Sequence, residues 1–126
     1  MGTNYYHVPD PCPTCGHGEE MHIGKSSGGW CFLLHVYPEY GINDLGDWEA
    51  IWSIGQIRNE YGDTISPEDM KKTITERTWT GPQMSRSEMA SNYAIDGPNG
   101  LLRHRLVHGV VKHGEGTWDC SVNDFS

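Results

Sequence analysis

The sequence contains no run of apolar residues long enough to cross a membrane, and its first segment, MGTNYYHVPD, lacks the basic start and apolar core of a signal peptide. Basic residues are also scarce, because 9 Lys and Arg face 17 Asp and Glu and give a net charge of −8. Non-specific nucleic-acid binding requires clustered basic residues that displace counterions. We therefore expect an acidic cytoplasmic protein that neither inserts into a membrane nor binds nucleic acid non-specifically.

Internal repeats, low-complexity tracts and linkers are also absent, so we expect residues 1–126 to form a single domain. Short strand-like and helix-like segments follow one another along the chain, which is typical of an α+β fold. We expect short antiparallel strands and two to three helices in this small domain.

The strands and helices can be located from periodicity and capping residues. Alternating apolar residues predict strands over 3–8, 29–38, 101–107 and 117–122, and a hairpin over 57–66. Helical periodicity predicts helices over 43–55, 66–77 and 85–93. Asp44 and Ser66 stand at the starts of the first two helices, where their side chains can accept hydrogen bonds from backbone amides.

The segment Cys12-Pro13-Thr14-Cys15-Gly16 carries the strongest chemical signal. Cysteines in a cytoplasm stay reduced, so metal binding is a commoner use for them than a disulfide. Two thiolates three positions apart on a tight turn can reach one tetrahedral zinc ion. We therefore predict that Cys12 and Cys15 bind zinc in a zinc-knuckle hairpin.

The remaining zinc ligands have to come from elsewhere in the chain. If residues 24–29 form the tip of a hairpin, His22 lies opposite Cys31, and cross-strand neighbours are close enough to bind one ion. The predicted ligand set is therefore Cys12, Cys15, His22 and Cys31. His35 is the alternative to Cys31, because four residues along one strand separate these two side chains by roughly 13 Å.

The segment HIGKSSGGW at 22–30 contains the Gly-Lys-Ser of a phosphate-binding loop. A Walker A motif needs a further glycine five positions before Gly24, but that position holds Glu19. The segment is also followed by a predicted strand instead of a helix. We therefore interpret it as a glycine-rich turn, with a weaker phosphate- or nucleotide-binding site at Lys25 and Ser26 as the alternative.

Two enzyme interpretations compete with a structural zinc. Zinc deaminases combine His-x-Glu with a later Pro-Cys-x-x-Cys, but the two His-x-Glu triplets of this chain, at 17–19 and 113–115, both follow the cysteines. A different zinc-dependent hydrolase would use His22, His35 or His113 beside an open zinc position. A small zinc hydrolase therefore remains the alternative to a binding protein.

The charges are unevenly distributed along the chain. Eight carboxylates and one basic residue lie between positions 39 and 69, whereas 101–113 contain three basic residues and three histidines without an acid. Such asymmetry suits a basic protein partner or an anion held at one end of the molecule. Asp47 and Glu49 lie on the polar side of the predicted helix over 43–55, so we expect them to contact a partner.

Several segments together carry a resemblance to known proteins. They are the Met-Gly-Thr-Asn-Tyr-Tyr start, the Cys-Pro-x-Cys-Gly knuckle, HIGKSS followed by GWCF, and the terminal GEGTWD. With these segments the chain resembles, over most of its length, a group of small phage and prophage proteins. The resemblance implies a phage-encoded protein in a bacterial host cytoplasm, and it implies no reaction. By analogy with small acidic phage proteins that bind host proteins, we expect a zinc-binding accessory protein that binds a host macromolecule, including a host defence protein.

Overall fold

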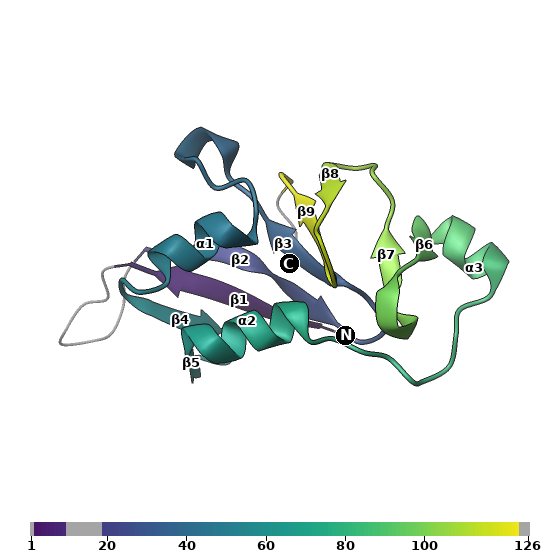
Figure 1. Cartoon of the computed structure of the whole chain (residues 1–126), viewed down its shortest axis with the longest axis horizontal. Helices are drawn as coiled ribbons and strands as arrows, with labels where there is room; N and C mark the ends of the chain where they lie inside the picture. The colour runs from purple at the N-terminus through teal and green to yellow at the C-terminus, as the bar shows by residue number, and fades with distance from the viewer. Residues whose placement is uncertain (1, 10–18, 124–126) are drawn as a thin grey trace.

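A seven-stranded sheet organises the fold, in the order β5-β4-β1-β2-β3-β9-β8 (Figure 1). The computed structural model describes residues 2–9 and 19–123. The strands of this sheet are β1 (Gly2–Val8), β2 (Met21–Ser27), β3 (Phe32–His35), β4 (Gln56–Asn59), β5 (Thr64–Ile65), β8 (Val110–His113) and β9 (Trp118–Ser121). Neighbouring strands are antiparallel except β3 and β9, which run parallel. The sheet is therefore mixed, whereas the sequence predicted antiparallel strands.

Two helices, α1 (Leu45–Ile51) and α2 (Pro67–Thr75), lie over one face of this sheet (Figure 1). Both begin where the sequence predicts, because the Asp44 and Ser66 side chains accept hydrogen bonds from backbone amides of the first turns. The main core lies between these helices and the sheet and includes Ile23, Phe32, Leu34, Trp48, Ile57, Met70 and Ile74. Alternation along β3 turns its even-numbered residues toward this core and its odd-numbered residues toward the opposite face.

A smaller unit lies at one end of the sheet (Figure 1). It consists of α3 (Arg86–Ser91), β6 (Ala94–Asp96) and β7 (Leu102–His104), with a 3-10 turn at Pro98–Gly100 between the two strands. A second 3-10 turn, at Pro38–Tyr40, follows β3 and lies outside this unit. The Cys31 amide donates to the Leu102 carbonyl oxygen over 2.8 Å and joins this unit to the sheet. The fold is thus a small α+β domain with three α-helices among the described residues. None of these helices is long and apolar enough to cross a membrane.

The segment at 24–29 is not the turn that the sequence predicted. Residues 24–27 continue strand β2, and the turn is confined to Gly28 and Gly29. It is closed by the Trp30 amide, which donates to the Ser27 carbonyl oxygen over 3.1 Å. The prediction erred because glycine and serine favour turns locally, whereas pairing with β1 and β3 holds this segment extended.

Gly24 has a packing role inside the sheet. A Cβ atom at this position would lie 2.3 Å from the Leu33 carbonyl oxygen and 2.4 Å from the Phe32 ring. Glycine within a strand commonly marks such a close approach. Close packing against Phe32 and Leu33 therefore accounts for the glycine that begins the Gly-Lys-Ser motif.

Strand β2 also contains a bulge at Ile23. Tyr5 pairs with Gly24 and Tyr6 pairs with His22, so Ile23 is an extra residue between the two pairs. A bulge shifts by one residue which side chains share a face of the sheet. The shift brings the His22 ring next to the ring of His35.

Candidate metal centre and surrounding surfaces

Two histidine rings meet on the sheet face opposite the helices. His22 in β2 and His35 in β3 approach each other with their Nδ1 atoms 3.1 Å apart. Their ring centroids are 5.3 Å apart, and the ring planes are inclined by 75°. His35 is only 2% exposed and His22 is partly buried, so the pair is largely shielded from solvent.

A hydrogen bond to Asn4 indicates the tautomer of His22. The Nε2 atom of His22 lies 2.8 Å from the Oδ1 atom of Asn4, and an amide oxygen only accepts, so this nitrogen carries the proton. In neutral His22 the lone pair is then on Nδ1, which faces His35. Two ring nitrogens at this distance need a shared proton or a cation between them, because two lone pairs repel. The two Nδ1 atoms can therefore bind either a shared proton or a cation.

Tyr37 covers the other side of His35. The two rings stack with their centroids 4.2 Å apart, and the tyrosine hydroxyl lies 3.2 Å from His35 Nδ1. The same hydroxyl donates to the His22 carbonyl oxygen over 3.1 Å. Tyr37 thus holds the His35 ring in place and links it to the His22 backbone, as outer residues commonly do around metal-binding imidazoles.

Cys31 does not lie opposite His22, because the strand register differs from the predicted one. Lys25 pairs with Leu33, which moves position 31 beyond the end of β3 and toward Arg103. Burial raises the pKa of the Cys31 thiol to about 11, and the charge of Asp119 adds to the shift. The expected opposition of His22 and Cys31 was therefore wrong, and His35 occupies that place.

The two other predicted ligands, Cys12 and Cys15, lie outside the described residues. Within residues 2–9 and 19–123, no three or more His, Cys, Asp and Glu side chains are arranged to hold a metal ion. Of the predicted ligands, the structure brings together only His22 and His35 among the described residues. The zinc-knuckle hairpin stays a prediction.

Lys25 and Ser26 lie on strand β2, between β1 and β3. Their backbone takes part in the pairing with Asn4, Thr3 and Leu33. An anion nest needs successive backbone amides that point into one concavity, whereas amides along a strand alternate in direction. The turn that would have formed the alternative anion site is therefore replaced by a strand at these two residues.

Asp47 and Glu49 border a surface depression of about 410 Å³ between α1, α2 and β9, called the acidic hollow here. Its lining includes four acids, Asp44, Asp47, Glu49 and Glu115, and one base, Lys71. Asp47 is exposed, and Glu49 is half-buried with its carboxylate 3.7 Å from the Lys71 ammonium. Asp47 is thus exposed on the polar side of α1 as expected, whereas Glu49 is half-buried and partly neutralised, and contact of either acid with a partner stays a prediction.

Asp44, at the acidic hollow, forms hydrogen bonds with residues of three different elements. Burial acts to raise the pKa of this carboxyl, but hydrogen bonds from the Trp118 indole, the Leu45 amide and Lys112 outweigh it and lower the pKa overall. The Trp118 Nε1–Oδ1 distance is 2.9 Å, and the Lys112 Nζ–Oδ2 distance is 3.1 Å. The helix cap thus also links α1 to β8 and β9, which the sequence did not indicate.

A buried carboxylate, Asp119, anchors a second polar cluster that sequence reasoning missed. Its side chain is 0% exposed and lies 2.9 Å from the Arg103 Nε atom and 3.0 Å from the His104 Nδ1 atom. The His104 amide donates to the same carboxylate over 2.9 Å. Buried charges require such partners. The sequence did contain a signal for this cluster, because an aspartate within the otherwise apolar strand 117–122 needs a basic partner and the segment 101–113 is basic.

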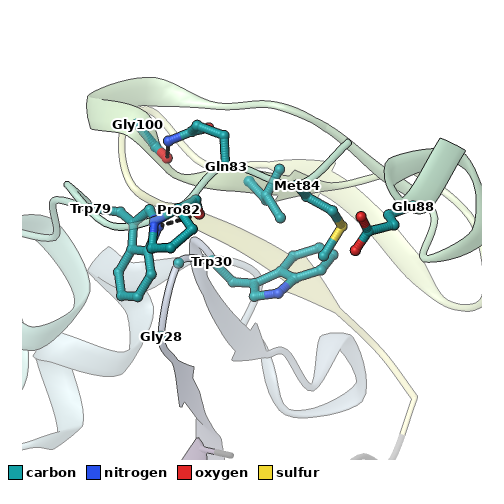
Figure 2. Close-up of a pocket in the computed structure, with 10 residues that line it drawn as sticks. Gly28, Trp30, Trp79, Pro82, Gln83, Met84, Glu88 and Gly100 are labelled. Carbon is teal, nitrogen blue, oxygen red and sulfur yellow. Dashed lines mark hydrogen bonds between the residues drawn. The ribbon is translucent and has the colours of Figure 1, made fainter. Parts of the chain in front are cut away.

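A second depression lies between two tryptophans (Figure 2). It has a volume of about 250 Å³ and is lined by Trp30, Trp79, Met84 and Glu88, among others. Figure 2 shows the Met84 sulfur beside the Trp30 ring and the Glu88 carboxylate at the same edge. The Trp79 indole donates to the Pro82 carbonyl oxygen over 3.1 Å, which holds its ring against the glycine turn.

The described cysteines do not form a nucleophilic site. Burial raises the pKa of Cys31 to about 11 and that of Cys120 to about 12, so both thiols stay protonated near neutral pH. Nucleophilic cysteines require the opposite shift.

Comparisons with protein-family models, with curated proteins and with solved structures found no significant match to this chain.

Proposed function

We propose that this chain is a zinc-stabilised binding protein that recognises a basic surface of a protein partner. The observation that carries the proposal is the approach of the His22 and His35 Nδ1 atoms to 3.1 Å. In the proposed centre the zinc ligands are Cys12, Cys15, His22 and His35.

The separation of the two nitrogens fits a shared zinc ion. Zinc binds histidine nitrogen at about 2.0–2.1 Å in tetrahedral geometry, so two such nitrogens lie about 3.3 Å apart. The pair is therefore close to ligand spacing. The Asn4 oxygen that accepts from His22 Nε2 supports the same arrangement, because it leaves Nδ1 as the ligand atom.

A complete set of four protein ligands favours a structural role. Structural zinc sites are closed, whereas catalytic sites keep one position for water or substrate. The high pKa values of Cys31 and Cys120 give no thiolate that could act as an alternative nucleophile. A small zinc-dependent hydrolase, with three protein ligands and one water, is the competing proposal.

The acidic hollow supports the choice of a basic partner. Four carboxylates line it. Glu49 pairs with Lys71 and Asp44 pairs with Lys112, which leaves Asp47 and Glu115 without an ion-pair partner among the described residues, and the whole chain carries a charge of −8. Charges around such a surface speed encounter with an oppositely charged partner and help to fix its orientation. In the phage setting that the sequence resemblance implies, the partner is a host macromolecule in the bacterial cytoplasm.

Metal analysis of matched variants tests the centre. The purified wild type is expected to contain close to one zinc ion per chain, and His35→Gln is expected to lose most of it and to melt earlier. Cys31→Ser is the matched control, because it removes the other candidate ligand, and it is expected to keep the zinc. Loss of zinc in Cys31→Ser but not in His35→Gln would reject the proposed ligand set.

The same preparations separate the structural site from the hydrolase. Cobalt(II) in place of zinc gives an absorption spectrum that reports the number of thiolate ligands and the coordination number. A four-coordinate spectrum with two thiolates, unchanged by added azide, supports a closed site. A spectrum that changes on addition of azide indicates an open position and favours the hydrolase.

A further inference from the structure

We propose that a depression on the sheet face opposite the helices binds a small carboxylate with an apolar body. It has a volume of about 270 Å³, and its lining includes Leu33, Tyr93, His104, Arg105, Val107 and His108. We call it the basic hollow. It is formed by the end of β7, the segment that leads to β8, and the turn before β6. The inference does not depend on the zinc centre or on the acidic hollow.

The charge of the basic hollow is opposite to that of the chain. None of the described residues that line it is acidic, although acids outnumber bases in the sequence by 17 to 9. The Arg105 side chain is exposed and forms no hydrogen bond or ion pair with any described residue. A guanidinium without a partner at the edge of a depression is suited to bind a carboxylate, with which it forms paired charged hydrogen bonds.

His104 adds a second polar group to the lining, and contacts behind it fix its orientation. Its Nδ1 atom is 3.0 Å from Asp119, and its backbone amide donates to the same carboxylate. Its ring packs on Trp30 with centroids 4.7 Å apart. No described residue forms a hydrogen bond with its Nε2 atom. Arg103 also pairs with the Asp119 carboxylate, so the His104 ring is held against a fixed and charge-compensated group.

Backbone strain is concentrated at the same place. Tyr93 and His108 have φ angles of 56° and 53°, which bulky residues rarely adopt. Their rings contact each other edge to face with centroids 4.6 Å apart. The Arg105 amide donates to the Tyr93 carbonyl oxygen over 2.9 Å, and the Asn123 side chain donates to the His108 carbonyl oxygen over 2.7 Å. Strained residues held in this way cluster at binding sites.

Size and lining select the class of ligand. A volume of about 270 Å³ lies just below the roughly 300–1,000 Å³ of drug-sized pockets, so the ligand is a small molecule. Leu33, Val107 and the Tyr93 ring provide apolar surface, which an inorganic anion would leave uncovered. A monoanionic carboxylate on a compact aromatic or branched aliphatic body satisfies both the charge and the apolar lining.

Titration followed by amide NMR at low ionic strength tests the site, with benzoate as the probe. Benzoate is expected to shift the amide signals of Tyr93, Val107 and His108 with saturable behaviour. Benzamide has the same shape without the charge, and inorganic phosphate has charge without an apolar body. Both are expected to bind at least about tenfold more weakly, as the loss of a charged hydrogen bond or of the apolar contact implies.

Variants connect the binding to the proposed residues. Arg105→Gln is expected to weaken benzoate binding about fivefold to tenfold while leaving the fold unchanged, because this side chain is exposed and has no partner among the described residues. Lys72→Gln, an exposed site on α2, makes the same charge change and is expected to bind benzoate as the wild type does. Benzamide binding equal to that of benzoate, phosphate binding as tight, or full binding by Arg105→Gln would each overturn the proposal.

Discussion

The Arg77 side chain donates from its Nη2 atom to the Ser27 carbonyl oxygen over 2.7 Å, across fifty residues of sequence. The same guanidinium donates from Nη1 to the Ser26 hydroxyl over 2.7 Å and from Nε to the Trp30 carbonyl oxygen over 3.0 Å. One side chain that follows α2 thus holds the turn between β2 and β3. The planar fork of arginine can satisfy these three acceptors together, and the point charge of lysine cannot.

Arg77→Lys is therefore expected to lower the free energy of unfolding by about 2–3 kcal/mol, because it leaves two partly buried acceptors without donors. Arg58→Lys is the matched control, since the Arg58 side chain bonds, among the described residues, to the nearby Gln56 side chain alone, and it is expected to change stability by less than about 0.5 kcal/mol. Urea unfolding of the three proteins measures the difference. Equal losses for both variants would show that the turn does not depend on Arg77.

The neighbouring residues Gly24 and Lys25 give a second prediction. Gly24→Ala is expected to destabilise the protein by about 2–4 kcal/mol, because the new methyl group would overlap the Phe32 ring and the Leu33 carbonyl oxygen. Lys25→Ala is expected to change stability by less than about 0.5 kcal/mol, because Lys25 forms no side-chain hydrogen bond or ion pair with the described residues.

The contrast between the two variants separates packing from phosphate binding. Thermal melting measures the stability of both variants, and calorimetry with inorganic phosphate measures whether they bind the anion. If Lys25→Ala abolished heat that phosphate produces with the wild type, the Gly-Lys-Ser motif would have to be interpreted again as an anion site.

Local signals in the sequence predicted the helices well. Asp44 and Ser66 cap α1 and α2 because an N-cap depends only on the next few residues. The hairpin with Gly62 at its tip, where φ is 86°, was confirmed for the same reason. The strands at 3–8 and 117–122 were confirmed as β1 and β9, since alternation within one strand is also local.

Long-range pairing was not predictable in this way. The partner of His22 depends on the bulge at Ile23 and on the β2–β3 register, and both are decided by how three strands pack together. The parallel neighbour of β3 depends in turn on the chain returning from more than eighty residues away. The cluster around Asp119 depends on how β9 packs against β7, where His104 lies 15 residues earlier in the sequence. No spacing within the sequence carries that information.

The two described thiols give a prediction on reactivity. With pKa values of about 11 and about 12, Cys31 and Cys120 carry very little thiolate at pH 8. Iodoacetamide is therefore expected to modify both at least about a hundredfold more slowly in the native protein than in denaturant, as judged by mass spectrometry of the separate peptides. Rapid native modification at Cys31 would mean that this side of the sheet opens readily.

The same shifts predict a loss of stability in alkali. Unfolded thiols lose their protons near their ordinary pKa of 9.0, whereas the folded ones keep them until about pH 11–12, so the folded state binds more protons in this range. Stability that is present below pH 9 is therefore expected to fall as the pH rises from 9 toward 11. Tyr5 acts in the same direction, because burial raises its pKa.

A double variant, Cys31→Ala with Cys120→Ala, isolates the thiols. Its unfolding free energy is expected to fall less steeply between pH 9 and pH 11 than that of the wild type, measured by urea unfolding at each pH. Slopes are compared instead of absolute stabilities, because both side chains are buried and their truncation has its own cost. Identical slopes would assign the alkaline loss to other groups.

The acidic hollow gives the last prediction. Asp47 accepts a hydrogen bond from the Asn43 amide over 2.9 Å, and Glu49 pairs with Lys71 at 3.7 Å, and both contacts lie at the surface. Reversal of both acids to Lys is therefore expected to lower stability by less than about 1 kcal/mol. Capture of a bacterial partner by this double variant is expected to be strongly reduced at low salt, where attraction between the two surfaces is least screened.

The matched control reverses Glu39 and Glu68 to Lys, which makes the same change in net charge at exposed positions outside the acidic hollow. Pulldown at two or more salt concentrations compares the two double variants for one and the same captured protein. If both lose that protein equally, the attraction comes from the overall charge of −8 and needs no specific surface. If the Asp47 and Glu49 reversals retain it at every salt concentration, the acidic hollow is a solvated surface, and the partner must bind elsewhere, for instance between Trp30 and Trp79.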